Sequence, residues 1–376
     1  MTTASQSAIK IVGAGPAGLA SAIVLARAGR KVEVHDRRKR PGGRFHNDFQ
    51  GLENWSSRGN ILEELSQAGI EASFDHTPVR TGLAFDSWGK AYAINSDEPL
   101  YYLLRRGDAA GSLDRGLLSQ AQDLGVIVKF GSHIKEEKGP AILAIGPRTA
   151  DVIAVGYIFE TDRPDGNWIC FDDKLAPLGY AYLLISSGKG TVATCMFTKF
   201  KEQNFFLKKT IEFFEARADL TMKNPKPMGG YGNFRLPRTA MQGNKLVIGE
   251  QAGFQDSLAG FGMTYAIRSG ILAARSLLES LDYTKLWKKE LLPLLQTSIA
   301  NRYLFNLAGP WGRRIALSRI ARSEARKTLQ QLYRPWWLSR LVRPLAVNRY
   351  KVPLKDKSCD HQNCQCVWCV HGLAHT

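Results

Sequence analysis

Three glycines near the start of the chain, Gly13, Gly15 and Gly18, have the G-x-G-x-x-G spacing of a dinucleotide-binding turn. They follow a β-branched run at 9–12 and precede a segment of small residues. In a strand–turn–helix unit, the first glycine permits the turn, the second lets the backbone approach a pyrophosphate, and the third lets the helix pack closely on the strand. The N–H groups and dipole of a helix that begins at Pro16 then favour phosphate.

A second predicted strand at 31–35 ends on Asp36, and seventeen residues separate Gly18 from this acid. That spacing is close to the one at which an acidic side chain reaches a ribose 2′-hydroxyl. A basic run beginning at Arg37 follows, and we expect it either to bind a phosphate or to form a solvated loop. The charge of Asp36 would repel a 2′-phosphate, which argues against NADP at this turn.

A glycine pair and a second strand–loop–helix extend the predicted site. Gly43 and Arg44 lie in a Pro-Gly-Gly-Arg turn, where glycine permits close backbone approach and arginine can clamp a dinucleotide. Residues 245–281 read as a strand, a glycine-rich loop and a long helix. A single nucleotide does not need this second unit. FAD does, because its ribityl chain and flavin extend beyond the pyrophosphate.

These segments, together with the strand end at 144–148, resemble the geranylgeranyl reductase family within the hydroxylase-like FAD superfamily. The resemblance covers residues 8–285. It implies an α/β protein with a Rossmann-like FAD-binding domain, a second antiparallel β-sheet as the substrate lobe, and a helical C-terminal region. The motifs and the resemblance together predict these cofactor-binding residues: Gly13, Gly15, Pro16, Ala17, Gly18, Asp36, Arg37, Gly43, Arg44, Arg106, Gly146, Gly249, Glu250, Gly260, Gly262 and Met263.

The chain also departs from patterns of the superfamily. Glu250 replaces the family's aspartate, and Ser257 replaces its proline. The stretch 179–185 lacks the tryptophan and proline of the family's substrate-sheet motif, which weakens the implied isoprenoid substrate. Ile145-Gly146 stands where the hydroxylases have Asp-Gly, and the halogenase tryptophan motif and lysine are not evident. The FAD prediction is unaffected by these departures.

The predicted function is an FAD-dependent oxidoreductase that reduces C=C bonds of a hydrophobic or isoprenoid-like substrate by hydride transfer from reduced flavin. Two alternatives stay open: an FAD monooxygenase that uses NAD(P)H and O2, and a flavin-bearing electron-transfer or partner-binding module. His46 is the candidate proton donor, although a lone histidine is more often a structural hydrogen-bonding residue, and Tyr180 is a second catalytic candidate. The candidate substrate-cavity residues are Phe45, His46, Trp55, Tyr180 and Tyr182.

The chain is expected to divide into four parts. These are a discontinuous FAD-binding domain at 1–78, 100–155 and 230–290, a substrate-binding sheet at 79–99 and 156–229, a basic helical region at 291–350, and a Cys/His-rich tail at 351–376.

The formal net charge of +17 favours acidic partners. Residues 301–351 contain twelve Lys or Arg and one acid, Glu324, with Trp and Tyr interleaved. Such helices suit an anionic membrane interface, or pack on the FAD domain with their arginines outside. Nucleic acid is an unlikely partner, because no dedicated motif is present. With no expected signal peptide or membrane span, the chain is predicted to be cytoplasmic, or peripheral at the inner face of the membrane.

Four of the six cysteines, Cys359, Cys364, Cys366 and Cys369, lie in the last eighteen residues. Their spacing permits a thiolate metal site holding zinc or an iron–sulfur cluster. The Cys366–Cys369 pair also has the spacing of a redox dithiol, which would suit docking of a redox partner protein. A tail without function is the third interpretation.

Overall fold

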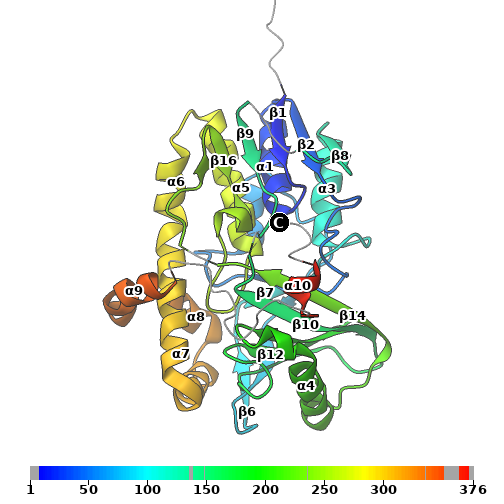
Figure 1. Ribbon diagram of the computed structural model, residues 1–376, viewed down its shortest axis with the longest axis vertical. Coiled ribbons are helices and arrows are strands. Elements are labelled where there is room, and N and C mark those ends of the chain that lie inside the picture. The colour runs from blue at the N-terminus through cyan, green and yellow to red at the C-terminus, as the bar shows by residue number, and fades with distance from the viewer. Residues whose placement is uncertain are drawn as a thin grey trace, which may run out of the picture.

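A six-stranded sheet carries the glycine-rich turn. The computed structural model describes residues 8–134, 139–147, 149–234, 236–334, 336–350 and 364–371. The strand order is β15-β16-β9-β1-β2-β8, parallel from β16 to β8, with β15 antiparallel at the edge (Figure 1). The strands are β1 (Ile9–Val12), β2 (Val32–Asp36), β8 (Ile127–Phe130), β9 (Ala141–Leu143), β15 (Met241–Gln242) and β16 (Lys245–Val247).

Helices pack on this sheet through small residues. Helix α1 contacts both α3 and α5. A Cβ atom built on Gly270 of α5 would lie 2.2 Å from the backbone oxygen of Ala17, so only glycine lets α5 approach α1 this closely. The helices of this part are α1 (Pro16–Arg27), α2 (Ile61–Gln67), α3 (Leu113–Asp123), α5 (Met263–Leu278) and α6 (Tyr283–Glu290), with a 3-10 turn η2 (Gly249–Ala252) before α5.

A seven-stranded sheet forms the second lobe, in the order β14-β10-β13-β12-β11-β5-β6. Its neighbours are antiparallel, as predicted, except that β5 and β11 run parallel. The strands are β5 (Thr81–Phe85), β6 (Ala91–Asn95), β10 (Val152–Glu160), β11 (Gly166–Cys170), β12 (Tyr180–Ser186), β13 (Lys189–Met196) and β14 (Lys223–Gly232). Helix α4 (Gln203–Ala218), preceded by a 3-10 turn η1 (Phe200–Glu202), packs on β10 and β13. The division into domains stays a prediction.

A third sheet was not anticipated from the sequence. It joins β3 (Phe49–Glu53), β7 (Tyr101–Arg105) and β4 (Thr77–Val79) in antiparallel pairs. From their mixture of aromatic and amide residues, residues 45–55 would be predicted to form a loop, which is wrong for the stretch 49–53. Phe49 and Leu52 are buried there, and β3 pairs with a strand about fifty residues later. Local pattern does not reveal such a distant partner.

The C-terminal region is helical, as predicted. Its helices are α7 (Leu292–Ala321), α8 (Ala325–Tyr333), α9 (Trp337–Arg349) and α10 (Val367–His371). Gly309 has φ 58° and ψ −166°, so α7 kinks there, directly before Pro310. Helix α7 packs against α6, α8, α9 and β6, whereas α10 lies apart from them on β10 and β14 (Figure 1). Among the described residues, no helix has the length and apolarity to cross a membrane.

Candidate cofactor and substrate site

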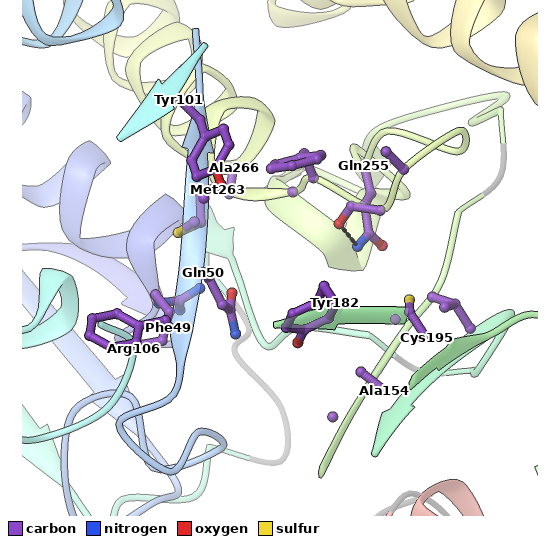
Figure 2. Close-up of a pocket in the computed structure, with 18 of the residues that line it drawn as sticks. Phe49, Gln50, Tyr101, Arg106, Ala154, Tyr182, Cys195, Gln255, Met263 and Ala266 are labelled. Atoms are coloured by element: carbon purple, nitrogen blue, oxygen red, sulfur yellow. Dashed lines mark hydrogen bonds between the residues drawn. The ribbon is translucent and has the colours of Figure 1, made fainter. Parts of the chain in front are cut away.

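One cavity of about 600 Å³ lies where the two large sheets and the C-terminal helices meet. At one end it is lined by the glycine-rich turn and Asp36, and at the other by apolar side chains of β5, β11, α7 and α8. In Figure 2, Gln50, Arg106 and Met263 lie on one side of the cavity, opposite Tyr182 and Cys195 of the seven-stranded sheet. The volume is typical of a small-molecule or cofactor site.

The three glycines of the turn have different surroundings. A Cβ on Gly13, whose φ is +116°, would lie 2.2 Å from the backbone oxygen of Ala144. A Cβ on Gly18 would lie 2.0 Å from the oxygen of Gly13. Gly15 instead lines the cavity, and nothing lies within 4 Å of its Cβ position. Gly13 and Gly18 therefore serve packing, while Gly15 leaves the backbone open to a ligand.

Asp36 at the end of β2 fixes the turn. One carboxylate oxygen accepts a hydrogen bond from the N–H of Ala14, and the other accepts one from the N–H of Arg38, each at 2.8 Å. Asp36 and the neighbouring Arg37 both line the cavity. The carboxylate thus holds the glycine turn and keeps lone pairs available for ribose hydroxyls.

Two arginines beside the cavity are paired with acids. Arg106 forms a bidentate pair with buried Asp114, at 2.9 and 3.0 Å, and lies 4.1 Å from the ring centroid of Phe45. Arg44 pairs with Glu250 at 2.9 Å. The Glu250 side chain, longer than the family's aspartate, thus reaches an arginine in a remote segment. These pairs bring donors to the cavity without leaving a buried charge uncompensated.

The donor and acceptor groups at the cavity fit FAD. Arg44 Nε, Trp55 Nε1 and Gln255 Oε1 are buried on lining residues and have no hydrogen-bond partner among the residues that the structure describes. Such groups are costly unless a ligand satisfies them. Helices α1 and α5 both begin at the cavity, and neither has a capping side chain or an acid in its first turn. Two positive helix ends and the three unpaired groups suit phosphates, hydroxyls and flavin carbonyls.

Most of the predicted cofactor residues meet at this one cavity. Of the sixteen, all line it except Gly13 and Gly18, which pack behind the turn. They come from five segments separated along the chain, near residues 15, 40, 106, 146 and 249–263. Phe45, Trp55, Tyr180 and Tyr182 also line the cavity.

His46 does not reach the cavity. Its side chain is exposed, and its backbone N–H donates to Asp48 at 3.0 Å in a turn. This position is at odds with the expected role of proton donor, because an exposed imidazole outside the cavity cannot contact a substrate held in it.

Tyr180 lines the cavity but has a partner for its hydroxyl group. That group donates to the carbonyl of Ala259, and burial raises the pKa of Tyr180 well above its usual value. Cys195, opposite Tyr180 on β13, has its pKa raised to about 12 by burial. Both groups are therefore neutral near pH 7, and Tyr180 holds the loop before α5 instead of presenting a free acid.

Asp256 is a positioning residue behind the cavity that the sequence did not reveal. Its side chain is buried, and one oxygen accepts from Ser298 Oγ at 2.5 Å and from the N–H of Leu258 at 3.2 Å. The other oxygen accepts from Tyr333 Oη at 3.0 Å and from the N–H of Ala259 at 2.7 Å. Burial raises its pKa, which the four hydrogen bonds oppose. Nothing local in the sequence pointed to its partners on α7 and α8.

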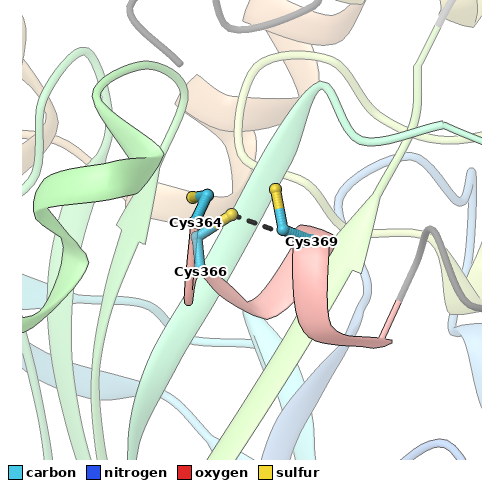
Figure 3. A group of neighbouring side chains, drawn as sticks. All are labelled: Cys364, Cys366 and Cys369. Atoms are coloured by element: carbon cyan, nitrogen blue, oxygen red, sulfur yellow. Dashed lines mark hydrogen bonds between the residues drawn. The ribbon is translucent and has the colours of Figure 1, made fainter. Parts of the chain in front are cut away.

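Three of the four tail cysteines form a cluster outside the cavity. The sulfur atoms of Cys364, Cys366 and Cys369 all lie within 4.8 Å of one another (Figure 3). Cys364 and Cys366 are buried, and Cys369 is half-buried. Cys359 lies outside the described residues.

Comparison with known proteins finds a family model that is similar to the N-terminal part of the chain. Residues 11–54 match the NAD(P)-binding Rossmann-like domain. A curated tRNA-(uracil-5-)-methyltransferase, TrmFO of Rhizobium meliloti, is 29% identical over 199 residues, which are 48% of this chain and 37% of that protein. A putative glutamate synthase small chain of Cereibacter sphaeroides is 40% identical over 83 residues, 22% of this chain and 20% of that protein. The chain thus matches well under half of each curated relative.

Solved structures are similar over nearly the whole chain. A geranylgeranyl bacteriochlorophyll reductase-like protein from Thermoplasma acidophilum has a TM-score of 0.62 at 18% identity, covering 91% of this chain and 96% of that one. The flavin-dependent brominase Bmp2 has a TM-score of 0.63 at 15% identity, covering 91% and 98%. PqsL of Pseudomonas aeruginosa, a probable FAD-dependent monooxygenase, has a TM-score of 0.59 at 14% identity, covering 87% and 99%. The predicted resemblance is confirmed at the level of fold.

The different roles of Gly15 and Gly18 predict opposite effects of the same substitution. Gly15→Ala should cost less than about 1 kcal/mol in stability, because its Cβ has space, but should weaken FAD binding at least tenfold. Gly18→Ala should cost roughly 2 kcal/mol, because its Cβ meets a backbone oxygen. Urea unfolding and flavin fluorescence titration measure the two effects. Wild-type FAD affinity in Gly15→Ala would contradict this assignment.

Asp256→Asn keeps the shape of the side chain but places an NH2 group against two donors, whichever way the amide is turned. We expect a loss of roughly 3 kcal/mol in stability, because a buried network loses an acceptor. Glu279→Gln, which affects an exposed pair with Arg275, is the control and should change stability by less than about 0.5 kcal/mol. Equal urea midpoints for Asp256→Asn and wild type would show that the Asp256 network is unimportant.

Proposed function

We propose that this chain, which has the fold of FAD-dependent oxidoreductases and monooxygenases, binds FAD and reduces a C=C bond of a hydrophobic substrate. The observation that carries the proposal is the continuity of the cavity. The same space that begins at the glycine turn and Asp36 ends among apolar side chains of the second lobe. A cofactor as long as FAD would extend from the first region to the edge of the second.

The residues that would hold FAD are those already at the cavity. The backbone N–H groups at Gly15 and Ala17 would bind the pyrophosphate, and Asp36 the adenosine ribose. Gly260, Gly262 and Met263, at the N-terminus of α5, would favour negative charge at the pyrimidine end of the flavin. The bound flavin supplies the hydride chemistry, and the protein orients it and excludes water.

The far end of the cavity is an apolar chamber, which we define by Leu83, Ile169, Phe171, Phe305, Leu317 and Ile320. Arg313 is the cation at this end, where it pairs with Asp173 at 2.9 Å and lies 4.2 Å from the Phe305 ring centroid. Its Nε is buried, and no described residue is a hydrogen-bond partner for it. An apolar chamber with one such donor suits a hydrophobic molecule that carries a single acceptor group, such as a carbonyl or carboxylate.

The alternative is an FAD monooxygenase. The structural similarity to PqsL supports this alternative, and the similarity to the reductase-like protein supports C=C reduction to an equal degree. In either reaction we propose NAD(P)H as the electron donor. The two functions differ in their use of oxygen. Substrate-dependent oxygen uptake with NAD(P)H favours the monooxygenase, whereas oxidation of reduced protein by an alkene without oxygen favours the reductase.

A substitution that fills the apolar chamber tests this function. Ala316 on α7 lines the cavity, and Ala316→Trp should leave FAD affinity unchanged while lowering the rate at which an isoprenoid alkene oxidises the reduced protein at least tenfold. Leu307→Trp, at an exposed position of α7 outside the lining, is the control and should retain the wild-type rate. Anaerobic stopped-flow absorbance of the flavin gives this rate. If no alkene or other apolar acceptor reoxidises the wild-type protein without oxygen, the reductase proposal fails.

We also propose that an anionic membrane surface is the source of the hydrophobic substrate. On α7, Leu307, Trp311 and Ile315 are 64–69% exposed, and Trp311 and Ile315, which follow the kink at Gly309, lie four residues apart on one face. Arg314 lies over the rings of Trp311 and Trp88, 5.5 and 5.0 Å from their centroids. This stripe borders Ala316 and Leu317, which line the cavity. Arginine beside exposed tryptophan suits the headgroup region of an anionic bilayer.

Helix α9 carries a second stripe of the same kind. Trp337, Leu341 and Leu345 are 60–73% exposed at the same spacing, and Arg340 and Arg343 are exposed beside them. Glu324, the acid of the described C-terminal helices, is engaged at the start of α8, where it accepts from the backbone of Arg326 and Lys327. The α9 stripe therefore combines apolar area with positive charge, whereas Arg314 beside the α7 stripe pairs with the buried carboxylate of Asp86 at 3.2 Å.

Vesicle sedimentation tests the membrane proposal. The protein should bind vesicles of phosphatidylcholine and phosphatidylglycerol at least tenfold more tightly than pure phosphatidylcholine, and salt should weaken the binding. The double variant Trp337→Ser, Leu341→Ser should lower the affinity at least fivefold. Phe205→Ser is the control: it removes from α4 an aromatic residue that is 55% exposed, and it should not change the affinity for vesicles. Absence of binding to anionic vesicles would refute the proposal.

A further inference from the structure

We propose that Cys364, Cys366 and Cys369 bind one zinc ion, which fixes the conformation of the C-terminal segment that packs on the wall of the cavity. The proposal rests first on the geometry of the three sulfur atoms, which lie within 4.8 Å of one another. Zn–S bonds of about 2.3 Å in a tetrahedral site would place the sulfurs roughly 3.8 Å apart. A contraction of at most about 1 Å would therefore complete the three ligands.

The arrangement of the three cysteines favours a single metal ion over a disulfide or an iron–sulfur cluster. A disulfide would join two of the sulfurs and leave the third in contact with them. An iron–sulfur cluster takes four cysteines, of which the described residues supply three at this place, and its ligand sulfurs lie farther apart than those around a single metal ion. Three thiolates around one point are a soft ligand set, which selects zinc among the common divalent ions.

The backbone around the cluster supports negative charge on sulfur. The N–H of Cys369 donates to Cys366 Sγ at 3.4 Å, as Figure 3 shows. The segment itself is held in place, because the Gln203 carboxamide accepts from the N–H of Val367 at 2.9 Å and donates to the carbonyl of Gln365 at 3.1 Å. Donors directed at a ligand atom orient it and stabilise its charged form.

The site is connected to the cofactor cavity by packing. Trp368 packs on Tyr231 of β14, with ring centroids 5.1 Å apart. On its other side Tyr231 lies 5.5 Å from the guanidinium of Arg44, and both residues line the cavity. A Cβ on Gly229 of β14 would lie 2.7 Å from the Val367 side chain, so the absence of a side chain at Gly229 lets the C-terminal segment pack closely on this strand. Zinc would thus stabilise the part of the cavity wall that contains Arg44. The effect of this on FAD binding rests on the proposed function, whereas zinc binding itself does not rest on it.

The binding step is an exchange of protons for metal. One Zn²⁺ displaces three thiol protons and forms three Zn–S bonds, with no change in oxidation state. The described residues offer no fourth His, Cys, Asp or Glu ligand to the cluster, so the fourth position is filled from elsewhere, for example by water. Because three protons are released, zinc affinity falls steeply as the pH is lowered.

Metal analysis of the FAD-loaded protein, purified under reducing conditions, tests the proposal. We expect one zinc per chain by mass spectrometry of the acid-digested protein. Cobalt(II) in its place should give tetrahedral thiolate absorption at wavelengths longer than those of flavin. Cys366→Ser and Cys369→Ser should each lower zinc affinity at least tenfold, whereas Cys170→Ala, a buried cysteine outside the cluster, should retain one equivalent.

Chelation separates the two claims. Removal of zinc should raise the dissociation constant for FAD at least threefold, because the wall behind Arg44 loosens. A protein that binds zinc but no FAD would uphold the metal site and refute the proposed function. Iron with acid-labile sulfide, a Cys366–Cys369 disulfide in the reduced preparation, or one zinc retained by the triple serine variant would each overturn the metal site.

Discussion

The buried carboxylate of Asp256 determines how the C-terminal helices meet the cofactor loop. Four donors surround its two oxygens, two from the backbone of the loop and one each from α7 and α8. A buried carboxylate is stable only when its lone pairs are satisfied, so the loop and both helices must hold their positions together. Residues of α7 and α8 also line the apolar chamber. Asp256 thus joins the loop before α5, which lines the cofactor end of the cavity, to two of the helices that line the other end.

The polar groups at the cofactor end of the cavity are of two kinds: some form hydrogen bonds or ion pairs within the protein, and others do not. Asp36, Arg106 and Glu250 satisfy neighbouring parts of the protein, which fixes the cavity before any ligand arrives. Arg44 Nε and Gln255 Oε1 are buried, and within the described part of the chain neither has a hydrogen-bond partner. A rigid frame with a few unsatisfied groups is what tight binding of a polar cofactor requires, because little ordering remains to be done when the ligand binds.

The sequence predicted the parts of the site that depend on local rules. Gly13, Gly15 and Gly18 could be assigned from their spacing, since a strand, a turn and a helix follow one another directly. Asp256 and the strand β3 could not be predicted, because their partners lie tens of residues away and their own surroundings are unremarkable. His46 shows the opposite failure, where a chemically suitable side chain next to a cofactor motif points into solvent. The type of a residue predicts what chemistry its side chain could perform, but tertiary packing decides whether that side chain reaches the cavity.

The central claim is that FAD and a hydrophobic substrate occupy one continuous cavity, and a ligand titration of the FAD-loaded protein tests it most directly. An isoprenoid alkene added to the oxidised holoprotein should perturb the flavin absorption bands in a saturable way, with FAD still bound. This result would place both molecules in contact at the junction of the two lobes. A protein that binds no FAD, or an alkene that binds without perturbing the flavin, would contradict the account.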